Sequence, residues 1–453
     1  MLSWVKVDYQ KNTEDEDEDE MRELVKIIQE LLRYDVKLAM GCTEPACCAL
    51  ATAWASSLLK KVPDKIDIEI SPNILKNALE VGIPGTEGLR GLNIALALGI
   101  VLADTKDGLT LLKNVNKDIL AKAKKLEDRI NIEVSKNGHE IYIKVKLTAG
   151  EDVVEAAIGG SHDNLILLRH NDDIQIEKNL EEEECPSEIL REKLVKYNFR
   201  DIIKAMEDID KETEDFMIEG LNINLEISKY GMEEAVGMGV GYYYKQLMDD
   251  FVISSDLLNE AKMYTATAVD ARMYGVNMPV MSSSGSGNQG IVATLPLYIV
   301  AGRWGQGREK LARAIAISHI SNSYIKFFTG KLSAMCGCVA AGIGTALGAG
   351  YLLGLKRGDI TGIMNNMVGN VCGIVCDGAK VGCSLKLATG VDSALTSALL
   401  VQRGIMIPGT NGICGSTPEE SIVNMSKVVA PGMITADEEI LKIMLERNLD
   451  KKI

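Results

Sequence analysis

The stretch EIYIKVKL, residues 140–147, alternates apolar and polar side chains. A period of two residues is typical of a β-strand that buries one face, because successive side chains point to opposite sides of a sheet. The same alternation occurs in KIDIEI (65–70) and in NIEV (131–134). The dipeptide Asn137-Gly138, a frequent turn signal, predicts a hairpin between residues 131–134 and 140–147.

The region around these strands differs in its sequence pattern from the rest of the chain. Further strands are expected near 152–158 and 164–168, and helices between residues 89 and 127. We therefore predict that residues 61–170 form a separate α/β domain.

The flanking sequence has the periodicity of helices. Within residues 21–58 apolar side chains recur three and four positions apart, and the sequence after residue 188 combines helical patterns with glycine-rich breaks. At 453 residues the chain is long enough for more than one core. We expect an α+β fold: a mostly helical domain of residues 21–60 and 188–453, into which the α/β domain is inserted.

Two acidic stretches lie beside these domains. Residues 14–20 (EDEDEDE) and 181–184 (EEEE) carry like charges, which repel one another and are usually solvated. We expect residues 1–20 to be a disordered acidic segment and residues 171–187 to be an acidic linker.

The composition favours a globular, soluble protein, with 46% hydrophobic and 25% charged residues. A net charge of −15 argues against nucleic acid and anionic membrane surfaces as partners. Residues 332–355 lack charged side chains over a length that could span a membrane, but their many glycines favour a helix buried in a protein core. The N-terminus has no apolar run typical of a signal peptide, so we expect a cytoplasmic protein without a membrane partner.

Ten cysteines in a chain without a secretion signal favour metal binding or catalysis over disulfides. Several lie beside glycines, whose unhindered N–H groups can donate to the sulfurs of an iron–sulfur cluster. A zinc site is less favoured, because the four histidines are scattered and no CxxC pair exists. The glycine-rich contexts are GCTEP (41–45), MCGC (335–338) and VCGIVCDGAKVGC (371–383).

Any single cysteine can instead be a small buried apolar residue, which we expect for Cys47, Cys48 and Cys414. A lone histidine in an apolar helix, such as His319, is more often a satisfied core residue than a base. The sequence SHDN (161–164) indicates no catalytic triad by itself.

The run MSSSGSGNQG, residues 281–290, is a candidate anion-binding loop. Consecutive small residues leave backbone N–H groups and hydroxyls free to surround a carboxylate or a phosphate, and a following helix adds a positive N-terminus. The alternative is a flexible surface loop, but the apolar flanks favour a buried one. The predicted substrate-binding residues are Ser282, Ser283, Ser284, Gly285, Ser286 and Asn288.

Four motifs in a shared order resemble the L-cysteine desulfidases, relatives of the α-part of the oxygen-labile iron–sulfur L-serine dehydratases. They are GCTEP (41–45), SSSGSGNQG (282–290), SAMCGC (333–338) and CDGAKVGCSLK (376–386). The similarity covers roughly residues 21–170 and 188–445, outside the two acidic stretches.

The resemblance implies a [4Fe–4S] cluster held by three thiolates, here Cys42, Cys336 and Cys376, with one iron open to substrate. Cys383 is a reserve candidate for one of the three ligands. The helical domain would then be the cluster-binding, catalytic one. The chain ends in LDKKI, without a terminal cysteine that could cap the open iron.

The activity implied is a β-elimination without pyridoxal phosphate, in which L-cysteine gives hydrogen sulfide, ammonia and pyruvate. The alternative is an L-serine dehydratase that releases water from the same site. Candidates for the base are His319, Lys380 and Lys386, and Lys380 is equally suited to compensate the charge of the thiolates. The expected partner is a small amino-acid substrate, and the sequence also allows a homodimer.

Overall fold

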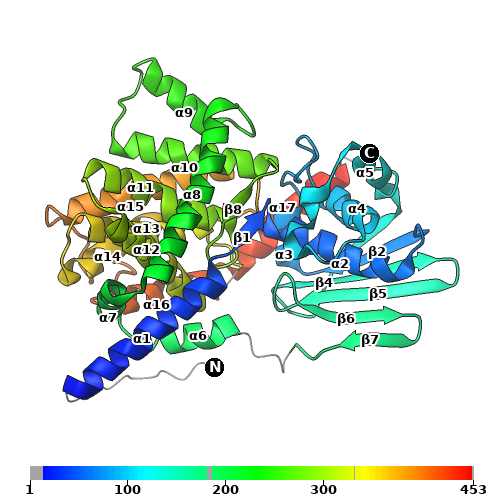
Figure 1. Ribbon diagram of the computed structural model, residues 1–453, viewed down its shortest axis with the longest axis horizontal. Helices are drawn as coiled ribbons and strands as arrows, with labels where there is room; N and C mark the ends of the chain where they lie inside the picture. Colours follow the sequence, from blue (N-terminus) through cyan, green and yellow to red (C-terminus); the bar gives the residue numbers. More distant parts are fainter. Residues whose placement is uncertain (1–13, 181–185, 331, 451–453) are drawn as a thin grey trace.

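The computed structural model describes residues 14–180, 186–330 and 332–450. These residues form a helical unit and an α/β unit that lie side by side (Figure 1). Each unit has its own buried apolar core. The expected α+β class, mostly helical with one mixed sheet, is confirmed.

The helical unit is built around α13, whose sixteen residues come from the charge-free stretch. Its glycines let neighbouring helices approach closely: a Cβ at Gly344 would lie 2.3 Å from the carbonyl oxygen of Ser318 on α12. No helix in the described part of the chain is long and apolar enough to span a membrane. The helices of this unit are α1 (Glu14–Asp35), α6 (Pro186–Leu194), α7 (Phe199–Ala205), α8 (Lys211–Glu233), α9 (Val240–Asp249), α10 (Leu257–Tyr274), α11 (Gly287–Arg303), α12 (Arg308–Thr329), α13 (Gly337–Leu352), α14 (Ile360–Val371), α15 (Cys383–Val401) and α16 (Pro418–Val429).

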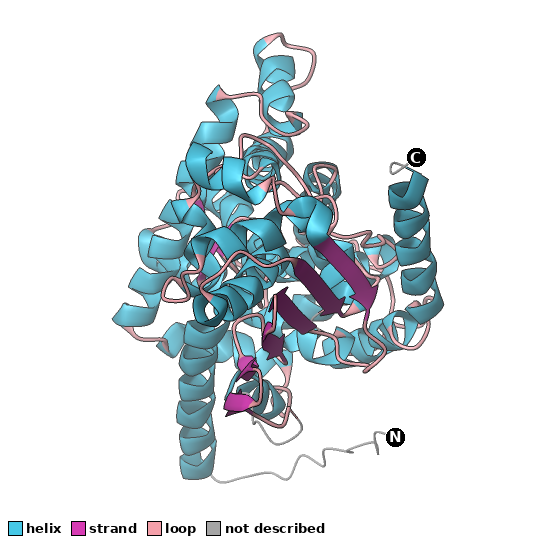
Figure 2. Cartoon of the chain, turned by 90° about the vertical axis from the view of Figure 1, so that its right-hand side faces the viewer, coloured by secondary structure: helices cyan, strands magenta, loops and turns pink. Residues whose placement is uncertain are grey.

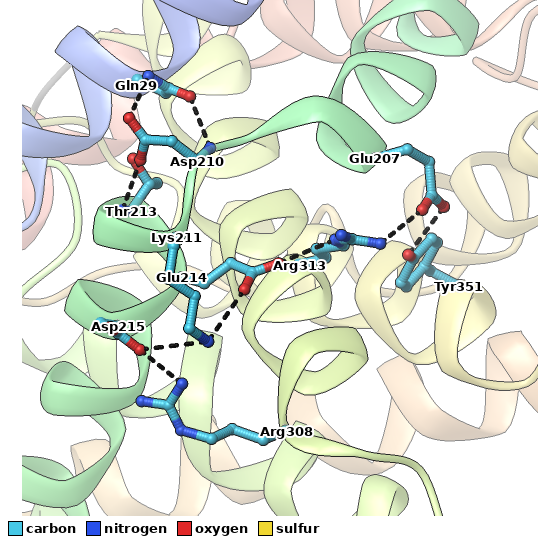
Figure 3. A network of polar contacts seen from close by, with 10 residues as sticks. All are labelled: Gln29, Glu207, Asp210, Lys211, Thr213, Glu214, Asp215, Arg308, Arg313 and Tyr351. Carbon is cyan, nitrogen blue, oxygen red and sulfur yellow. Dashed lines mark hydrogen bonds and ion pairs between the residues drawn. The ribbon is translucent and has the colours of Figure 1, made fainter.

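A polar network on this unit fixes α1 against α8 and α12 (Figure 3). Gln29 on α1 donates to the Asp210 carboxylate over 3.0 Å and accepts from its backbone N–H over 2.9 Å. The same carboxylate caps the N-terminus of α8 by accepting from the N–H of Thr213. Arg313 on α12 donates to the buried Glu214 of α8 over 3.1 Å. These contacts hold α1 in place, so that its C-terminal end is fixed at the boundary with the α/β unit.

The α/β unit has a six-stranded sheet in the order β3-β2-β4-β5-β6-β7. Helix α2 packs on one face of the sheet, and α4 packs on α2. The opposite face carries ion pairs such as that between Lys144 and Glu155, as expected for a sheet with one solvated face. The elements are α2 (Thr43–Leu59), β2 (Lys65–Ile70), α3 (Pro72–Ala78), α4 (Leu92–Leu102), α5 (Lys117–Ala123), β3 (Ile130–Val134), β4 (Tyr142–Ala149), β5 (Asp152–Gly159), β6 (Leu165–His170), β7 (Asp173–Glu177) and α17 (Ile434–Asp450).

Several contacts join the units, among them a ribbon of two strands and a helix that returns from one unit to the other. The short strands β1 (Leu38–Met40) and β8 (Pro279–Met281) pair in an antiparallel ribbon. Helix α17 returns from the helical unit to pack against α3, where Lys76 forms an ion pair with Asp437. Seen from the side of the α/β unit, α17 stands at the edge beside the sheet and ends at the C-terminus (Figure 2).

The expected hairpin at Asn137-Gly138 is wrong. β2 lies between the two strands: it pairs with β3 in parallel, Ile66 opposite Ile130, and with β4 in antiparallel fashion, Ile66 opposite Leu147. The turn therefore joins strands that are not neighbours. Alternation predicted the strands correctly, but a local turn signal cannot report a third strand that comes from earlier in the chain.

The structure also differs from the expected limits of the domains. Residues 14–20 are not disordered but form the first turns of α1, where Arg22 pairs with Glu18 one turn away; residues 1–13 lie outside the described residues. Within 171–187, residues 173–177 form β7 rather than a linker, because they pair with β6, Leu168 opposite Ile176; residues 181–185 lie outside the described residues. α2 and α17, expected in the helical domain, pack in the α/β unit.

Replacing Gly344 by alanine should destabilise the protein, because the added methyl group would clash with a backbone atom of α12 that cannot move alone. We expect a loss of about 1–3 kcal/mol in the free energy of unfolding, measured by chemical denaturation. Gly302, on α11, has no neighbour within 4 Å of an added Cβ. Gly302→Ala is therefore the control and should be neutral or stabilising; equal losses in the two variants would contradict this account of the packing.

Candidate active site

A cavity of about 400 Å³ lies where the helical unit meets the α/β unit. The helical unit contributes the loop before α11, the end of α12 and the segments before α13 and α15. The α/β unit contributes the start of α2, the end of α3 and the turn between β5 and β6. The cavity is large enough for a small ligand and combines residues that are far apart in the sequence.

The N-termini of four helices converge on this cavity. Cys42 is the N-cap of α2, Ser286 of α11 and Cys336 of α13, and all three line the cavity. Cys383, the first residue of α15, lines it too. A helix N-terminus presents unpaired N–H groups and a partial positive charge. The cavity is therefore arranged to attract anions such as thiolates or a carboxylate.

Cys336 and Cys376 lie side by side because their backbones pair. The N–H of Cys336 donates to the carbonyl of Ile374 over 2.8 Å, and the N–H of Cys376 donates to that of Ala334 over 2.6 Å. Their side chains hydrogen-bond to each other. The hydrogen bond to Cys336, followed by burial, raises the pKa of the Cys376 thiol. The pair is thus protonated near neutral pH unless a cation binds to it.

Cys42 approaches the same cavity from α2. Its thiol donates to the Glu44 carboxylate over 2.9 Å, and Glu44 in turn accepts from the Asn77 side chain over 3.0 Å. Burial, and then the charge of Glu44, raise the pKa of Cys42. The Cys383 thiol interacts electrostatically with the thiol pair. Burial raises the pKa of Cys383, and the charge of Cys376 also raises it.

The donor set suits an iron–sulfur cluster, although the side chains are not arranged as ligands. Among the described residues, no three His, Cys, Asp or Glu side chains stand in metal-binding geometry. Five thiols nevertheless line one cavity, near helix N-termini that can supply N–H groups to the sulfurs: Cys42, Cys336, Cys338, Cys376 and Cys383. Soft thiolates fit iron and sulfide, so the residues present fit such a group.

The serine-rich run forms a buried loop between β8 and α11, not a flexible surface loop. Its backbone is tied to the end of α1: the N–H of Ser284 donates to the carbonyl of Asp35 over 3.0 Å, and that of Ser282 donates to Lys37 over 2.8 Å. Ser284 has a left-handed φ of 46°. The members that line the cavity are Ser282, Ser284, Gly285, Ser286, Asn288 and Gln289. Ser283 points elsewhere, and its hydroxyl accepts from Asn322.

A buried ion pair holds this loop. Arg191 donates to both oxygens of the Asp35 carboxylate over 2.7 and 2.8 Å, and both side chains are at most 5% exposed. The carboxylate also accepts from the hydroxyls of Ser284 and Ser323. Because Asp35 joins α1, α6, α12 and the loop through one carboxylate, it determines where the loop lies in the cavity.

The three candidate bases lie outside the cavity lining. His319 is buried within α12, and burial alone lowers its pKa to about 3. Lys380 forms ion pairs with Asp377 over 3.6 Å and Glu80 over 3.7 Å. Lys386, the third candidate, forms an ion pair with Asp377 and is also outside the lining.

Sequence reasoning missed four buried cations that do line the cavity, namely Lys76, Arg191, Arg272 and Lys326. Burial lowers the pKa of Lys326 to about 8, and its amine donates to the carbonyl of Gly330 over 3.1 Å. The signal was a single charged residue within an apolar helical stretch, as in YIKFF (324–328). Such residues are usually solvated, so the pattern alone did not separate them from surface lysines and arginines.

A cavity with thiols, hydroxyls and buried cations at converging helix N-termini is typical of an enzyme for a small anionic substrate. The comparisons agree with this class. The family model described as serine dehydratase alpha chain matches residues 106–442, about three quarters of the chain. The chain belongs to this family, which places it among lyase-type enzymes associated with iron–sulfur clusters. The relationship to the α-part of serine dehydratases, expected from the motifs, is confirmed.

The relatives match almost the full length of the chain. A UPF0597 protein of Alkaliphilus oremlandii is 41% identical over 426 residues, 93% of this chain and 98% of that protein. A UPF0597 protein of Clostridioides difficile is 38% identical, covering 92% and 99% of the two chains. Another, from Caldanaerobacter subterraneus, is 37% identical, covering 94% and 100%.

Removing one partner of the buried ion pair should destabilise the protein and displace the serine loop. Asp35→Asn leaves the Arg191 guanidinium buried without its main counter-charge, which should cost about 3–5 kcal/mol in chemical denaturation. The double variant with Arg191→Met removes both charges and should recover part of this loss.

The control is Glu226→Gln, which breaks the exposed pair of Glu226 and Lys229 and should change stability little. A loss in Asp35→Asn no larger than in this control would show that the buried pair does not hold the loop.

Proposed function

We propose that this protein is an iron–sulfur lyase that eliminates sulfide from L-cysteine and yields pyruvate and ammonia. The observation that carries the proposal is the cavity itself. The Cys336–Cys376 pair, further thiols, the serine loop and buried cations face one another at the N-termini of four helices. Membership in the serine dehydratase alpha chain family supports a lyase of this chemistry.

The thiols of Cys336 and Cys376 would hold a [4Fe–4S] cluster, together with a third thiol from Cys42. Cys383 is the alternative third ligand, since its charge couples to that of Cys376, whereas the Cys42 thiol is engaged by Glu44. When bound, the cluster supplies Lewis acidity to the leaving group through an iron without a protein ligand. The helix N-termini stabilise the thiolate form of these ligands, which their burial otherwise opposes.

The remaining residues would bind and orient the substrate. Hydroxyl and N–H groups of the Ser282–Asn288 loop bind the carboxylate, and the wall contributed by the α/β unit excludes bulk water. Loss of the α-proton and cleavage of the Cβ–S bond form aminoacrylate and release sulfide. Water then hydrolyses the corresponding imine to pyruvate and ammonia, so that one cysteine and one water give hydrogen sulfide, ammonia and pyruvate.

A residue of the cavity should accept the α-proton. His319 and Lys380 were the candidates by sequence, but neither lines the cavity. Lys326 does, and its amine is close enough to Cys336 and Cys376 to interact electrostatically with both. We therefore favour Lys326 by its position as the proton acceptor.

L-Cysteine is preferred over L-serine because a thiophilic iron activates a thiolate leaving group better than a hydroxide. Serine dehydration in the same site is the second candidate, favoured by the family to which the chain belongs. Both reactions give pyruvate, so the two are separated by the leaving group.

Protein purified without oxygen should release sulfide and pyruvate in equal amounts from L-cysteine without added pyridoxal phosphate. Pyruvate formation from L-serine should be at least tenfold slower, judged by kcat/KM. Faster turnover of serine would favour the second candidate. A requirement for pyridoxal phosphate would exclude the proposed mechanism.

Iron and acid-labile sulfide, measured per chain after anaerobic purification, test the ligands. Cys336→Ala and Cys376→Ala should each lose most of the iron, because each removes one of the two paired thiols that would hold the cluster. Cys42→Ala and Cys383→Ala distinguish the third ligand, and only one of them should lose iron to the same extent.

Cys47→Ala is the matched control, since Cys47 is buried in α2 and does not line the cavity. Full iron content in Cys336→Ala and in Cys376→Ala would contradict the cluster site.

A further inference from the structure

We propose that Arg272 binds the carboxylate of the substrate and thereby restricts the enzyme to amino acids with a free α-carboxylate. This inference rests on the proposed function, and it assigns the main anion contact to a residue outside the serine loop. It concerns a side chain that the cysteine and serine motifs did not indicate.

Arg272 is a buried cation without a carboxylate partner. It lies in the last turn of α10, is 3% exposed and lines the cavity. Its Nη1 atom donates to the side-chain oxygen of Asn288 over 2.8 Å, and its Nε atom has no hydrogen-bond partner among the described residues. Within that part of the chain the guanidinium also forms no ion pair, and the side chain that accepts its hydrogen bond is a neutral amide.

One neighbour of Arg272, the start of α11, adds positive potential to that of the guanidinium. The guanidinium packs on the first turn of α11, where a Cβ on Gly287 would lie 2.4 Å from its Nε atom. This contact places a full positive charge beside the positive end of a 17-residue helix. A buried charge in such a position is costly unless an anion joins the site.

The arrangement has the features of a carboxylate site. A guanidinium offers several N–H groups in one plane, which suit the two oxygens of a carboxylate. Asn288 holds one edge of this plane through Nη1, while Gln289, also in the cavity lining, has a buried side-chain oxygen without a partner in the described chain. That oxygen can accept from the ammonium group of an α-amino acid bound to Arg272. Carboxylate and ammonium would then be recognised at neighbouring positions on α11.

A second role for Arg272 would be to compensate the charge of bound thiolates, since its charge lowers the pKa of Cys42 against the larger effect of burial. The two roles differ in their consequences. A charge-compensating arginine would be needed for the cluster to bind, whereas a carboxylate-binding arginine would be needed only for the substrate.

The test uses protein purified without oxygen and L-alanine, which has the α-amino carboxylate but no leaving group. Its dissociation constant is compared with that of L-alaninamide, which lacks the negative charge, by titration calorimetry. The variants are Arg272→Met and Arg272→Lys. Arg303→Met is the matched control, because Arg303 lies in the last turn of α11 but pairs with Glu260 at the surface.

In the wild type, L-alanine should bind more tightly than L-alaninamide. Arg272→Met should weaken binding of L-alanine on the order of 100-fold and leave that of L-alaninamide unchanged. Arg272→Lys keeps the charge but not the planar donors, so its affinity for L-alanine should lie between those of the wild type and Arg272→Met. If Arg272→Met does not fold, the binding of L-alanine and L-alaninamide to Arg272→Lys tests the proposal instead. Arg303→Met should bind as the wild type does.

The inference is overturned by wild-type affinity for L-alanine in the Arg272 variants, by wild-type protein that does not bind L-alanine, or by loss of iron from the Arg272 variants. Failure of the proposed function looks different. A wild type that binds L-alanine through Arg272 but releases no sulfide from L-cysteine would keep this carboxylate site and exclude the proposed reaction.

Discussion

The convergence of four helix N-termini on one cavity is the constraint on which the rest of the site depends. α2, α11, α13 and α15 come from different parts of the chain, yet each begins at the cavity wall. Their combined positive potential suits bound thiolates and a substrate carboxylate, and it opposes the burial that keeps free thiols protonated. The same potential makes the buried side chain of Arg272 costly in the absence of an anion.

Close packing makes this convergence possible. Glycines on α13 let it pack closely on α12, and Gly99 on α4 allows the same against α2, where a Cβ would lie 2.0 Å from the carbonyl of Ala49. The Asp35–Arg191 pair and the network between α1, α8 and α12 then fix the wall that carries the serine loop. The site is built at a junction, so the stability of both units contributes to its geometry.

Much of the fold could be predicted from local patterns, because alternation and helical periodicity reflect which faces are buried. The strand at 140–147 and the buried helix in 332–355 followed from such patterns. The pairing of β2 between β3 and β4 did not, since strand order depends on contacts between distant segments. The membership of α2 in the α/β unit was missed for the same reason.

The candidate site, too, could be predicted from the sequence only in part. Cysteines beside glycines and a run of serines have a distinctive local composition, and the structure brings most of them to one cavity. Asp35 and Arg191 lie 156 residues apart, and each alone resembles an ordinary surface charge. Arg272 and Lys326 were missed because only the fold shows that they are buried beside the thiols. His319, in contrast, has a suggestive sequence context but lies outside the cavity lining.

The most direct test of the account is the Mössbauer spectrum of iron-57-labelled protein, purified without oxygen, before and after addition of L-cysteine. We predict the spectrum of a [4Fe–4S] cluster in which one iron differs from the others, and a change of that iron alone when L-cysteine binds. A protein without cluster iron, or a cluster whose irons all remain unchanged by L-cysteine, would contradict the account.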